Sequence, residues 1–143
     1  MKKNRIILSL AVVLWLTSSV SAATIDRIAV RSEAMKKEIP VVVIVPDAAK
    51  SGVRMPVLYL LHGYSGDQET WLNVKPSLPQ MADRDSVIVV CPDGENSWYW
   101  DSPLDPASQF ETFVSQEFPD WIDAHYPTIP SREGRAITGL SMG

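Results

Sequence analysis

The chain has 143 residues, with 13 Lys and Arg against 17 Asp and Glu, for a formal charge of −4. Its 45% hydrophobic and 21% charged residues are typical of a globular domain and exclude disordered, collagenous and coiled-coil chains. The acidic balance argues against a nucleic-acid partner, because binding phosphates needs an excess of positive charge. A single cysteine excludes an intramolecular disulfide and a cysteine-rich zinc site.

Residues 1–22 have the pattern of a secretory signal peptide. Basic residues open the segment, an apolar stretch runs from Ile6 to Leu16, and small residues stand at 20–22 before the cleavage point. The apolar stretch is shorter than the roughly 20 residues of a spanning helix, although an uncleaved membrane anchor is the alternative. We therefore expect a secreted or periplasmic protein, free of the membrane after cleavage, whose single folded domain occupies residues 23–143.

The first elements expected after the signal are the two strands of an antiparallel hairpin. Residues 25–30 and 40–45 are rich in β-branched side chains, and turn residues follow the second stretch. Pro40 lacks a backbone N–H, so it suits the first position of a strand or an edge strand.

Two continuous apolar runs, 57–61 and 87–91, come next. Continuous rather than alternating apolar character is typical of parallel strands that are buried on both faces. Parallel strands need a long crossover, which residues 69–84 supply, with a helix expected over Ser77 to Asp83. Cys91 lies inside the second run, so we expect it to pack as a small hydrophobic residue.

A helix is expected over residues 109–125, followed by a third sheet strand over Arg135 to Thr138. Pro119 removes one backbone donor, which predicts a bend within the helix. Alternation of strands and helices indicates an α/β fold. The apolar face of the helix follows a period of 3.6 residues and comprises Phe110, Val114, Phe118, Trp121, Ile122 and His125.

The third strand runs directly into Gly139-Leu140-Ser141-Met142-Gly143, which matches G-x-S-x-G. A serine exposed on a sharp turn between a strand and a helix needs small neighbours two residues away on either side. The motif predicts that Ser141 is a nucleophile on such an elbow. The alternative is an ordinary glycine-serine turn.

A second glycine motif, His62-Gly63-Tyr64, ends the strand at 57–61. In a hydrolase with this serine motif, an oxyanion hole uses the N–H after the nucleophile and one from the loop after an early strand. These would be the N–H groups of Met142 and Tyr64, unless the motif is a plain glycine turn. We expect His62 to bond locally and shape this loop rather than act as the base, because in this fold the catalytic histidine follows the serine.

Three consecutive aromatic residues, Trp98, Tyr99 and Trp100, follow the strand at 87–91. Ligands of open α/β sheets bind beyond the carboxyl ends of the strands, so Trp98 and Tyr99 are candidates to bind substrate. The alternative, that they pack the loop onto the body of the domain, is equally compatible with the pattern. The carboxylates have no spacing typical of a metal site, and we predict neither a metal nor another cofactor.

These segments together resemble the putative esterase family, the esterase D-like α/β-hydrolases. The resemblance rests on residues 59–64, 92–94, 97–99, 101–103, 110–113 and 135–143, and it covers nearly all of the expected domain. It implies an α/β-hydrolase fold with a mostly parallel sheet and an N-terminal antiparallel hairpin. It also implies that Ser141 is the nucleophile, and that Tyr64 and Met142 provide the oxyanion N–H groups.

The same resemblance places the catalytic Asp and His of the family after the serine, and the sequence stops at Gly143. We therefore expect this chain to be the N-terminal part of one hydrolase domain, truncated at the nucleophile elbow and inactive by itself. The expected function is that of a secreted serine carboxylic-ester hydrolase acting on a small-molecule or carbohydrate ester, with acetyl or feruloyl groups favoured. An acyltransferase of the same fold and a non-catalytic carbohydrate-binding pseudoenzyme are the alternatives.

Overall fold

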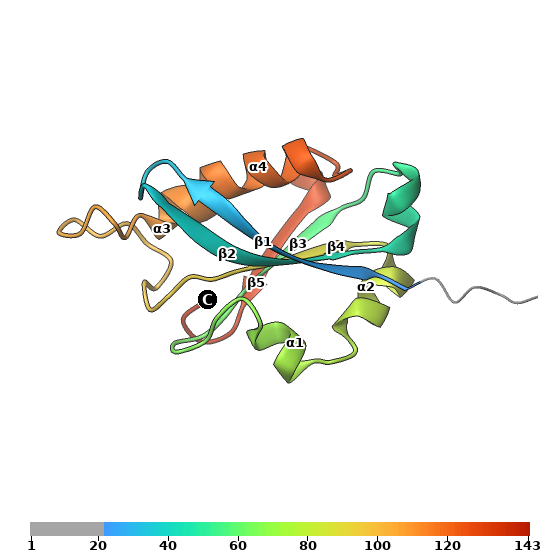
Figure 1. Ribbon diagram of the computed structural model, residues 1–143, viewed down its shortest axis with the longest axis horizontal. Helices are drawn as coiled ribbons and strands as arrows, with labels where there is room; N and C mark the ends of the chain where they lie inside the picture. The colour runs from blue at the N-terminus through green and yellow to red at the C-terminus, as the bar shows by residue number, and fades with distance from the viewer. Residues whose placement is uncertain (1–21) are drawn as a thin grey trace, which may run out of the picture.

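The computed structural model of the protein describes residues 22–143, and the signal peptide expected at the N-terminus lies outside them except for residue 22. The described chain forms one five-stranded sheet in the order β1-β2-β4-β3-β5, with helices on both of its faces (Figure 1). All the strands expected from the sequence are present. Their bounds are Thr24–Ser32 for β1, Lys37–Val45 for β2, Val57–Leu61 for β3, Ile88–Pro92 for β4 and Arg135–Gly139 for β5.

The sheet is mixed rather than mostly parallel over the described residues. β1 and β2 form the expected antiparallel hairpin, and β2 also pairs antiparallel with β4. Parallel pairing joins β3 to β4 and β3 to β5. The hairpin therefore extends one edge of a parallel core, and the C-terminal strand β5 occupies the other edge among the described strands.

Pro40 lies inside β2 rather than at its start, and β2 has neighbours on both sides. The carbonyl of Pro40 accepts a hydrogen bond from the Asp93 N–H at 2.8 Å, just beyond the last pair of the β2–β4 ladder, Val41 with Pro92. In an antiparallel strand the N and O atoms of one residue point to the same side. The position of the missing Pro40 N–H thus faces β4, at the point where the β2–β4 ladder ends. The β1–β2 hairpin therefore loses no hydrogen bond because of the proline.

The continuous apolar strands divide their side chains between two hydrophobic clusters, one on each face of the sheet. Val41, Val43, Tyr59 and Val90 pack on the face covered by the C-terminal helices. The alternate side chains pack on the face covered by the helix after β3 and comprise Val42, Ile44, Leu60, Val89 and Cys91. Cys91 is buried as expected, and burial raises the pKa of its thiol to about 12, which keeps it in the unreactive protonated form.

The crossover between β3 and β4 holds two short helices, α1 (Thr70–Val74) and α2 (Leu78–Asp85). The second confirms the helix expected from Ser77, with Pro79 in its first turn, where a missing N–H costs nothing. Two 3-10 turns, η1 (Asp47–Ser51) and η3 (Arg132–Gly134), precede β3 and β5.

The helix expected over 109–125 is present but is not continuous α-helix. It comprises α3 (Phe110–Thr112), a π-helical turn η2 (Phe113–Glu117) and α4 (Phe118–His125). The Phe118 N–H bonds back five residues to the Phe113 carbonyl, and Pro119 has no N–H to offer. The expected bend is therefore a π turn placed just before the proline, a known way to re-register a helix.

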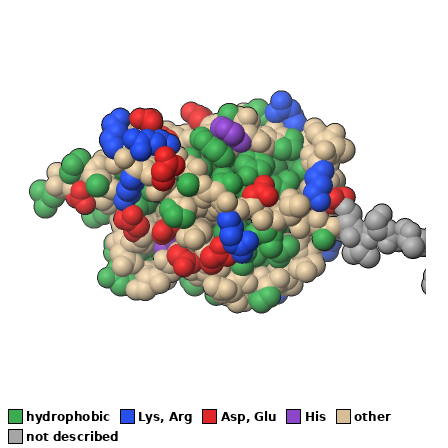
Figure 2. All heavy atoms as spheres, in the orientation of Figure 1, with side chains coloured by type: hydrophobic (Ala, Val, Ile, Leu, Met, Phe, Trp, Pro, Cys, Tyr) green, Lys and Arg blue, Asp and Glu red, His purple; other side chains and the backbone are tan. Residues whose placement is uncertain are grey.

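The π turn brings an extra aromatic ring into the core. Phe113, which the 3.6-residue spacing did not select, is fully buried and stacks on Phe118 with ring centroids 5.3 Å apart. Phe118 also meets the Tyr59 ring edge-on at 5.5 Å. In contrast, His125 is exposed and stacks on the half-buried Trp121. Figure 2 shows an area of hydrophobic side chains on the surface where α4 meets β1. Within residues 22–143, no helix has the length and apolar character needed to cross a membrane.

Candidate active site

The loops that follow β3, β4 and β5 meet at one end of the sheet, because parallel strands end on the same side. These three loops, residues 62–66, 93–99 and 140–143, are called the rim below. The rim contains every residue that the sequence nominated for chemistry or substrate binding: Tyr64, Trp98, Tyr99, Ser141 and Met142.

Ser141 lies on a tight turn directly after β5. Its φ of 57° is in the left-handed region, which is strained for a residue with a side chain. The turn is closed by a hydrogen bond of 3.0 Å from the Gly143 N–H to the Leu140 carbonyl, and a Cβ on Gly139 would collide with the backbone of Gly143. Ser141 is exposed. The glycine spacing of the motif thus produces the sharp, strained elbow that the sequence predicted.

The elbow lies against the loop after β3. The Leu140 N–H continues the sheet by bonding to the Leu61 carbonyl at 3.2 Å. A Cβ at Gly63 would lie 3.4 Å from the Ser141 Cβ and 3.2 Å from the Leu140 oxygen. The absence of a side chain at position 63 therefore allows the backbone of this loop to approach the serine closely.

Two backbone N–H groups belong to the residues that follow this contact in the chain: Tyr64 follows Gly63, and Met142 follows Ser141. Among the described residues, neither group donates to a backbone or side-chain acceptor. The Met142 side chain is buried and anchors the elbow, whereas the Tyr64 side chain is exposed. The arrangement leaves both amides available to an acceptor from outside, which is what a developing oxyanion requires. Their role in an oxyanion hole stays a prediction.

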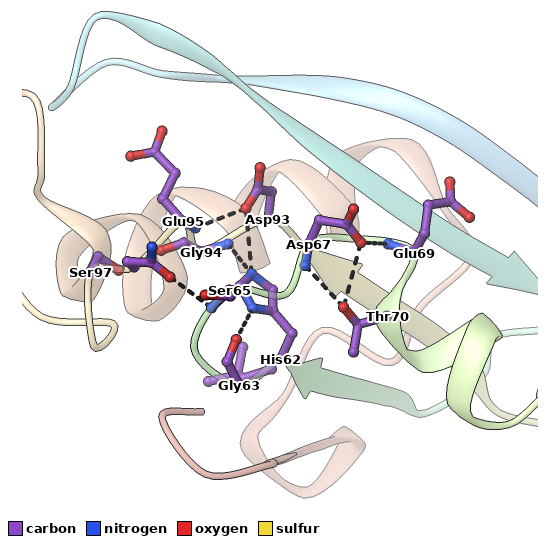
Figure 3. Close-up of polar contacts among 12 residues, drawn as sticks. His62, Gly63, Ser65, Asp67, Glu69, Thr70, Asp93, Gly94, Glu95 and Ser97 are labelled. Carbon is purple, nitrogen blue, oxygen red and sulfur yellow. Dashed lines mark hydrogen bonds and ion pairs between the residues drawn. The ribbon is translucent and has the colours of Figure 1, made fainter.

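His62 is the buried centre of the rim, with 1% of its surface exposed. Its Nδ1 lies 2.7 Å from the Gly63 carbonyl oxygen, and its Nε2 accepts a hydrogen bond of 2.8 Å from the Gly94 N–H. The backbone N–H of His62 donates to the Tyr99 hydroxyl at 3.0 Å. Figure 3 shows the imidazole between the loops after β3 and β4. The local bonding expected of His62 is confirmed. The sequence did not predict its hydrogen bond to Gly94 in the loop after β4.

Asp93 lies beside the same imidazole, with its Oδ1 3.4 Å from Nε2. Burial lowers the pKa of His62, but the Asp93 carboxylate and the Gly63 carbonyl outweigh burial, and together they raise that pKa above its ordinary value. The imidazole in turn lowers the pKa of Asp93. The carboxylate also accepts the Glu95 N–H at 2.8 Å, so it orders the start of its loop.

The aromatic residues of the loop after β4 have different environments. Tyr99 packs against the core, meets the His62 ring at 5.7 Å, and covers Gly94 so closely that a Cβ there would collide with its ring. Trp98 is 59% exposed. Both have positive φ, 58° and 53°, and the Asn96 side chain ties this loop to the Ser65 N–H at 2.8 Å. Tyr99 thus holds the loop in place, Trp98 projects into solvent, and substrate binding by either remains a prediction.

Both histidines of the chain bond to groups other than Ser141. The chain has two histidines; His62 uses both ring nitrogens in the rim, and His125 has its Nδ1 on the Trp121 carbonyl at 2.7 Å. Neither bonds to Ser141. Within the same residues, no group of three or more histidines, cysteines or carboxylates is placed to hold a metal ion.

The sequence comparisons find esterases. The family model described as "Putative esterase" matches residues 32–143. An acetyl esterase of Caldicellulosiruptor saccharolyticus is 37% identical over 89 residues, 62% of this chain and 33% of that protein. An esterase of Mycobacterium tuberculosis is 33% identical over 105 residues, 71% of this chain and 23% of that protein.

Solved structures show the same fold. An S-formylglutathione hydrolase from Agrobacterium tumefaciens superposes with a TM-score of 0.73 at 26% identity, covering 86% of this chain and 52% of that one. A ferulic acid esterase gives a TM-score of 0.72 at 29% identity, covering 85% and 49%. The chain thus spans about half of these structures, and between 23% and 38% of the curated relatives. The neighbours establish the α/β-hydrolase fold that the motifs indicated.

Proposed function

We propose, since this chain belongs to the "Putative esterase" family, that it supplies the nucleophile and the oxyanion hole of a serine ester hydrolase. The Ser141 hydroxyl would attack the ester carbonyl and give up its proton to a base. The C–O bond to the alcohol would then break as the base passes the proton to the departing oxygen, leaving an acyl-enzyme that water hydrolyses. Tyr64 and Met142 N–H groups would bind the oxyanion of each tetrahedral intermediate.

The observation that carries this proposal is the contact between the elbow and the loop after β3. A strained, exposed serine lies against Gly63, with two uncommitted amides beside it. Backbone strain of this kind costs about 1–3 kcal/mol and persists where the surroundings enforce it, often at functional sites. A plain glycine-serine turn has no need of a strained serine, nor of a neighbouring backbone held this close.

The proposed reaction also needs a base, and neither histidine of the chain is available to Ser141. Nucleophilic serines are weak without one. We therefore expect the 143 residues alone to turn over esters slowly, and the activity proposed here is that of the protein expressed from its full gene.

For the substrate, we propose acetyl or feruloyl esters of carbohydrates, handled outside the cytoplasm. The names of the acetyl esterase and ferulic acid esterase relatives support the acyl groups. The signal-like residues 1–22 support secretion. The exposed Trp98, on the loop after β4, offers an aromatic face on which a sugar or a phenolic ring can stack.

A non-catalytic carbohydrate-binding module is the second candidate. It is favoured by one observation, the large exposure of Tyr64, Trp98 and Trp100 on neighbouring segments. Such a module would bind sugar equally well with or without the Ser141 hydroxyl, whereas the hydrolase depends on it.

The test is hydrolysis of p-nitrophenyl acetate by the full-gene protein. Ser141→Ala should lower kcat/KM at least a thousandfold, as loss of a catalytic nucleophile does. Ser86→Ala is the matched control, because Ser86 is also an exposed serine at positive φ, 54°, but at the end of α2 away from the rim. Equal activity of the two variants would contradict the proposal. Adding a sugar acceptor to the same assay separates hydrolysis from acyl transfer.

A further inference from the structure

We propose that His62 is a positioning residue that sets the direction of the Tyr64 N–H by holding the carbonyl of the same peptide unit. This inference rests on the proposed function, because it concerns one of the two proposed oxyanion donors. It gives a role to a buried histidine that takes no part in the attack by Ser141.

The planar peptide unit between Gly63 and Tyr64 links the carbonyl that His62 holds to the proposed oxyanion donor. The Gly63 carbonyl and the Tyr64 N–H belong to one rigid trans unit, so they point in opposite directions. The Gly63 oxygen is held by two donors, the His62 Nδ1 at 2.7 Å and the Gly66 N–H at 3.0 Å. Fixing this oxygen therefore fixes the aim of the Tyr64 N–H.

The hydrogen bond at Nε2 determines which of the two ring nitrogens of His62 carries the proton. The Gly94 N–H donates to Nε2 at 2.8 Å, so Nε2 must present a lone pair. In the neutral imidazole the proton then sits on Nδ1, where it points at the Gly63 carbonyl. The loop after β4 thus selects the tautomer that holds the loop after β3, much as outer hydrogen bonds orient metal-binding histidines.

The surroundings leave the ring little freedom. A Cβ at Gly66 would lie 2.9 Å from Nδ1 and 3.0 Å from the Gly63 oxygen, so this glycine allows the turn to close over the imidazole. On the other side the Tyr99 ring packs edge-on against it. A buried imidazole with both nitrogens hydrogen-bonded holds the Gly63 carbonyl in one orientation. If that carbonyl were bonded only to water, the peptide unit could rotate and change the direction of the Tyr64 N–H.

Two substitutions separate the two ring nitrogens. In His62→Asn, the side-chain amide can place an N–H donor near the position of Nδ1 but offers nothing to Gly94. In His62→Gln, the longer side chain can place its oxygen near Nε2, accept from Gly94, and leave the Gly63 carbonyl without its side-chain donor. A merely structural role of His62 predicts equal effects of both changes.

The kinetic test uses the full-gene protein and p-nitrophenyl acetate. We expect His62→Gln to lower kcat roughly 10- to 100-fold, which is a smaller loss than the one caused by removing an oxyanion donor. The KM of this variant should stay within about threefold of the parent value. His62→Asn should keep kcat within about fivefold of the parent. Equal losses in both variants, or a loss confined to His62→Asn, would overturn the proposal.

A second measurement does not depend on hydrolysis or on the variants. Long-range ¹H–¹⁵N NMR of the parent protein at a pH where His62 is neutral should show a protonated Nδ1 and an unprotonated Nε2. The opposite tautomer would overturn the proposal even if the esterase assay succeeds. The expected tautomer in a protein without esterase activity would leave the anchoring intact and reject the proposed function instead.

Discussion

The rim and the β1–β2 hairpin differ in backbone conformation: the hairpin is regular and the rim is strained. The hairpin pairs nine residues of each strand in one unbroken register, and its positive φ is confined to Lys36 in the turn. Of the seven non-glycine residues at positive φ in the described chain, five lie in the rim: Ser65, Glu95, Trp98, Tyr99 and Ser141. Strain is thus gathered where the strands end and is nearly absent where they pair.

Stability and chemistry reside in different regions of the molecule. The hairpin and the two hydrophobic clusters bury apolar side chains from every strand but β5, and burial contributes about 25 cal/mol per Å² of apolar surface. The rim holds its loops through hydrogen bonds around His62 and through glycines that permit close approach. We expect changes in the core to alter stability and changes in the rim to alter reactivity.

The largest expected effect on stability is in the core. Phe118 is fully buried between Tyr59 and Phe113, so Phe118→Ala should lower the free energy of unfolding by about 3–5 kcal/mol. Denaturant unfolding followed by circular dichroism measures this. The reactivity of Ser141 per folded molecule should stay near the parent value. A large loss of reactivity in protein that is still folded would contradict the separation of stability and reactivity between the core and the rim.

Gly63→Ala should show the opposite behaviour. The new Cβ would press on the Leu140 oxygen and the Ser141 Cβ at 3.2 and 3.4 Å, which a small shift of the elbow relieves. We expect labelling of Ser141 by a fluorophosphonate to slow by up to roughly 10-fold, because a shift of a few tenths of an ångström is smaller than the misplacement of about 1 Å that costs about 100-fold.

The matched control for that change is Gly52→Ala. Gly52 has open space around its Cβ position and a φ of 80°, so the alanine should cost stability but leave labelling unchanged. A Gly63→Ala protein that labels at the parent rate would show that the contact has no bearing on the serine.

Release of strain gives a smaller effect. Ser141→Gly should stabilise the folded protein by about 0.5–1 kcal/mol, because glycine adopts positive φ without a steric penalty, partly offset by its freer unfolded state. Ser86→Gly, at φ 54°, should stabilise by a similar amount with activity retained. Thermal unfolding of both variants checks this, and destabilisation by Ser141→Gly would mean that the elbow is not strained.

The smallest expected effect concerns the charge on His62. The Asp93 carboxylate raises the pKa of the imidazole, so Asp93→Asn should lower it, as measured by NMR titration. A raised folded pKa means that this contribution to stability is fully present below the unfolded histidine pKa of about 6.5 and fades as pH rises through the folded value. The variant should therefore lose stability mainly on the acidic side, and an unchanged His62 pKa would show that the carboxylate is too well solvated to act.

Much of the fold could be predicted because local pattern and burial agree. The continuous apolar runs at 57–61 and 87–91 fill both hydrophobic clusters, and the glycines around Ser141 form the turn their spacing requires. The π turn at 113–117 could not be predicted in the same way. It depends on the missing N–H of Pro119 and on the space that the core leaves for Phe113.

The candidate site likewise contains features that the sequence could predict and features that it could not. Ser141 and the Gly63-Tyr64 segment carry a local signal, two glycine motifs at strand ends, and the structure brings them together. The bond from Gly94 to His62 joins residues 32 positions apart, and no local pattern contains it. The role of Tyr99 in holding the loop depends in the same way on where β3 lies beside β4, which only the folded sheet defines.

The most direct test of the central claim is a crystal structure of the full-gene protein after reaction with a small alkyl fluorophosphonate. We expect a phosphorus bonded to the Ser141 Oγ and a phosphoryl oxygen about 3 Å from both the Tyr64 and Met142 nitrogens, as oxyanion donors require. An adduct on another residue, or a phosphoryl oxygen turned away from these two amides, would contradict it.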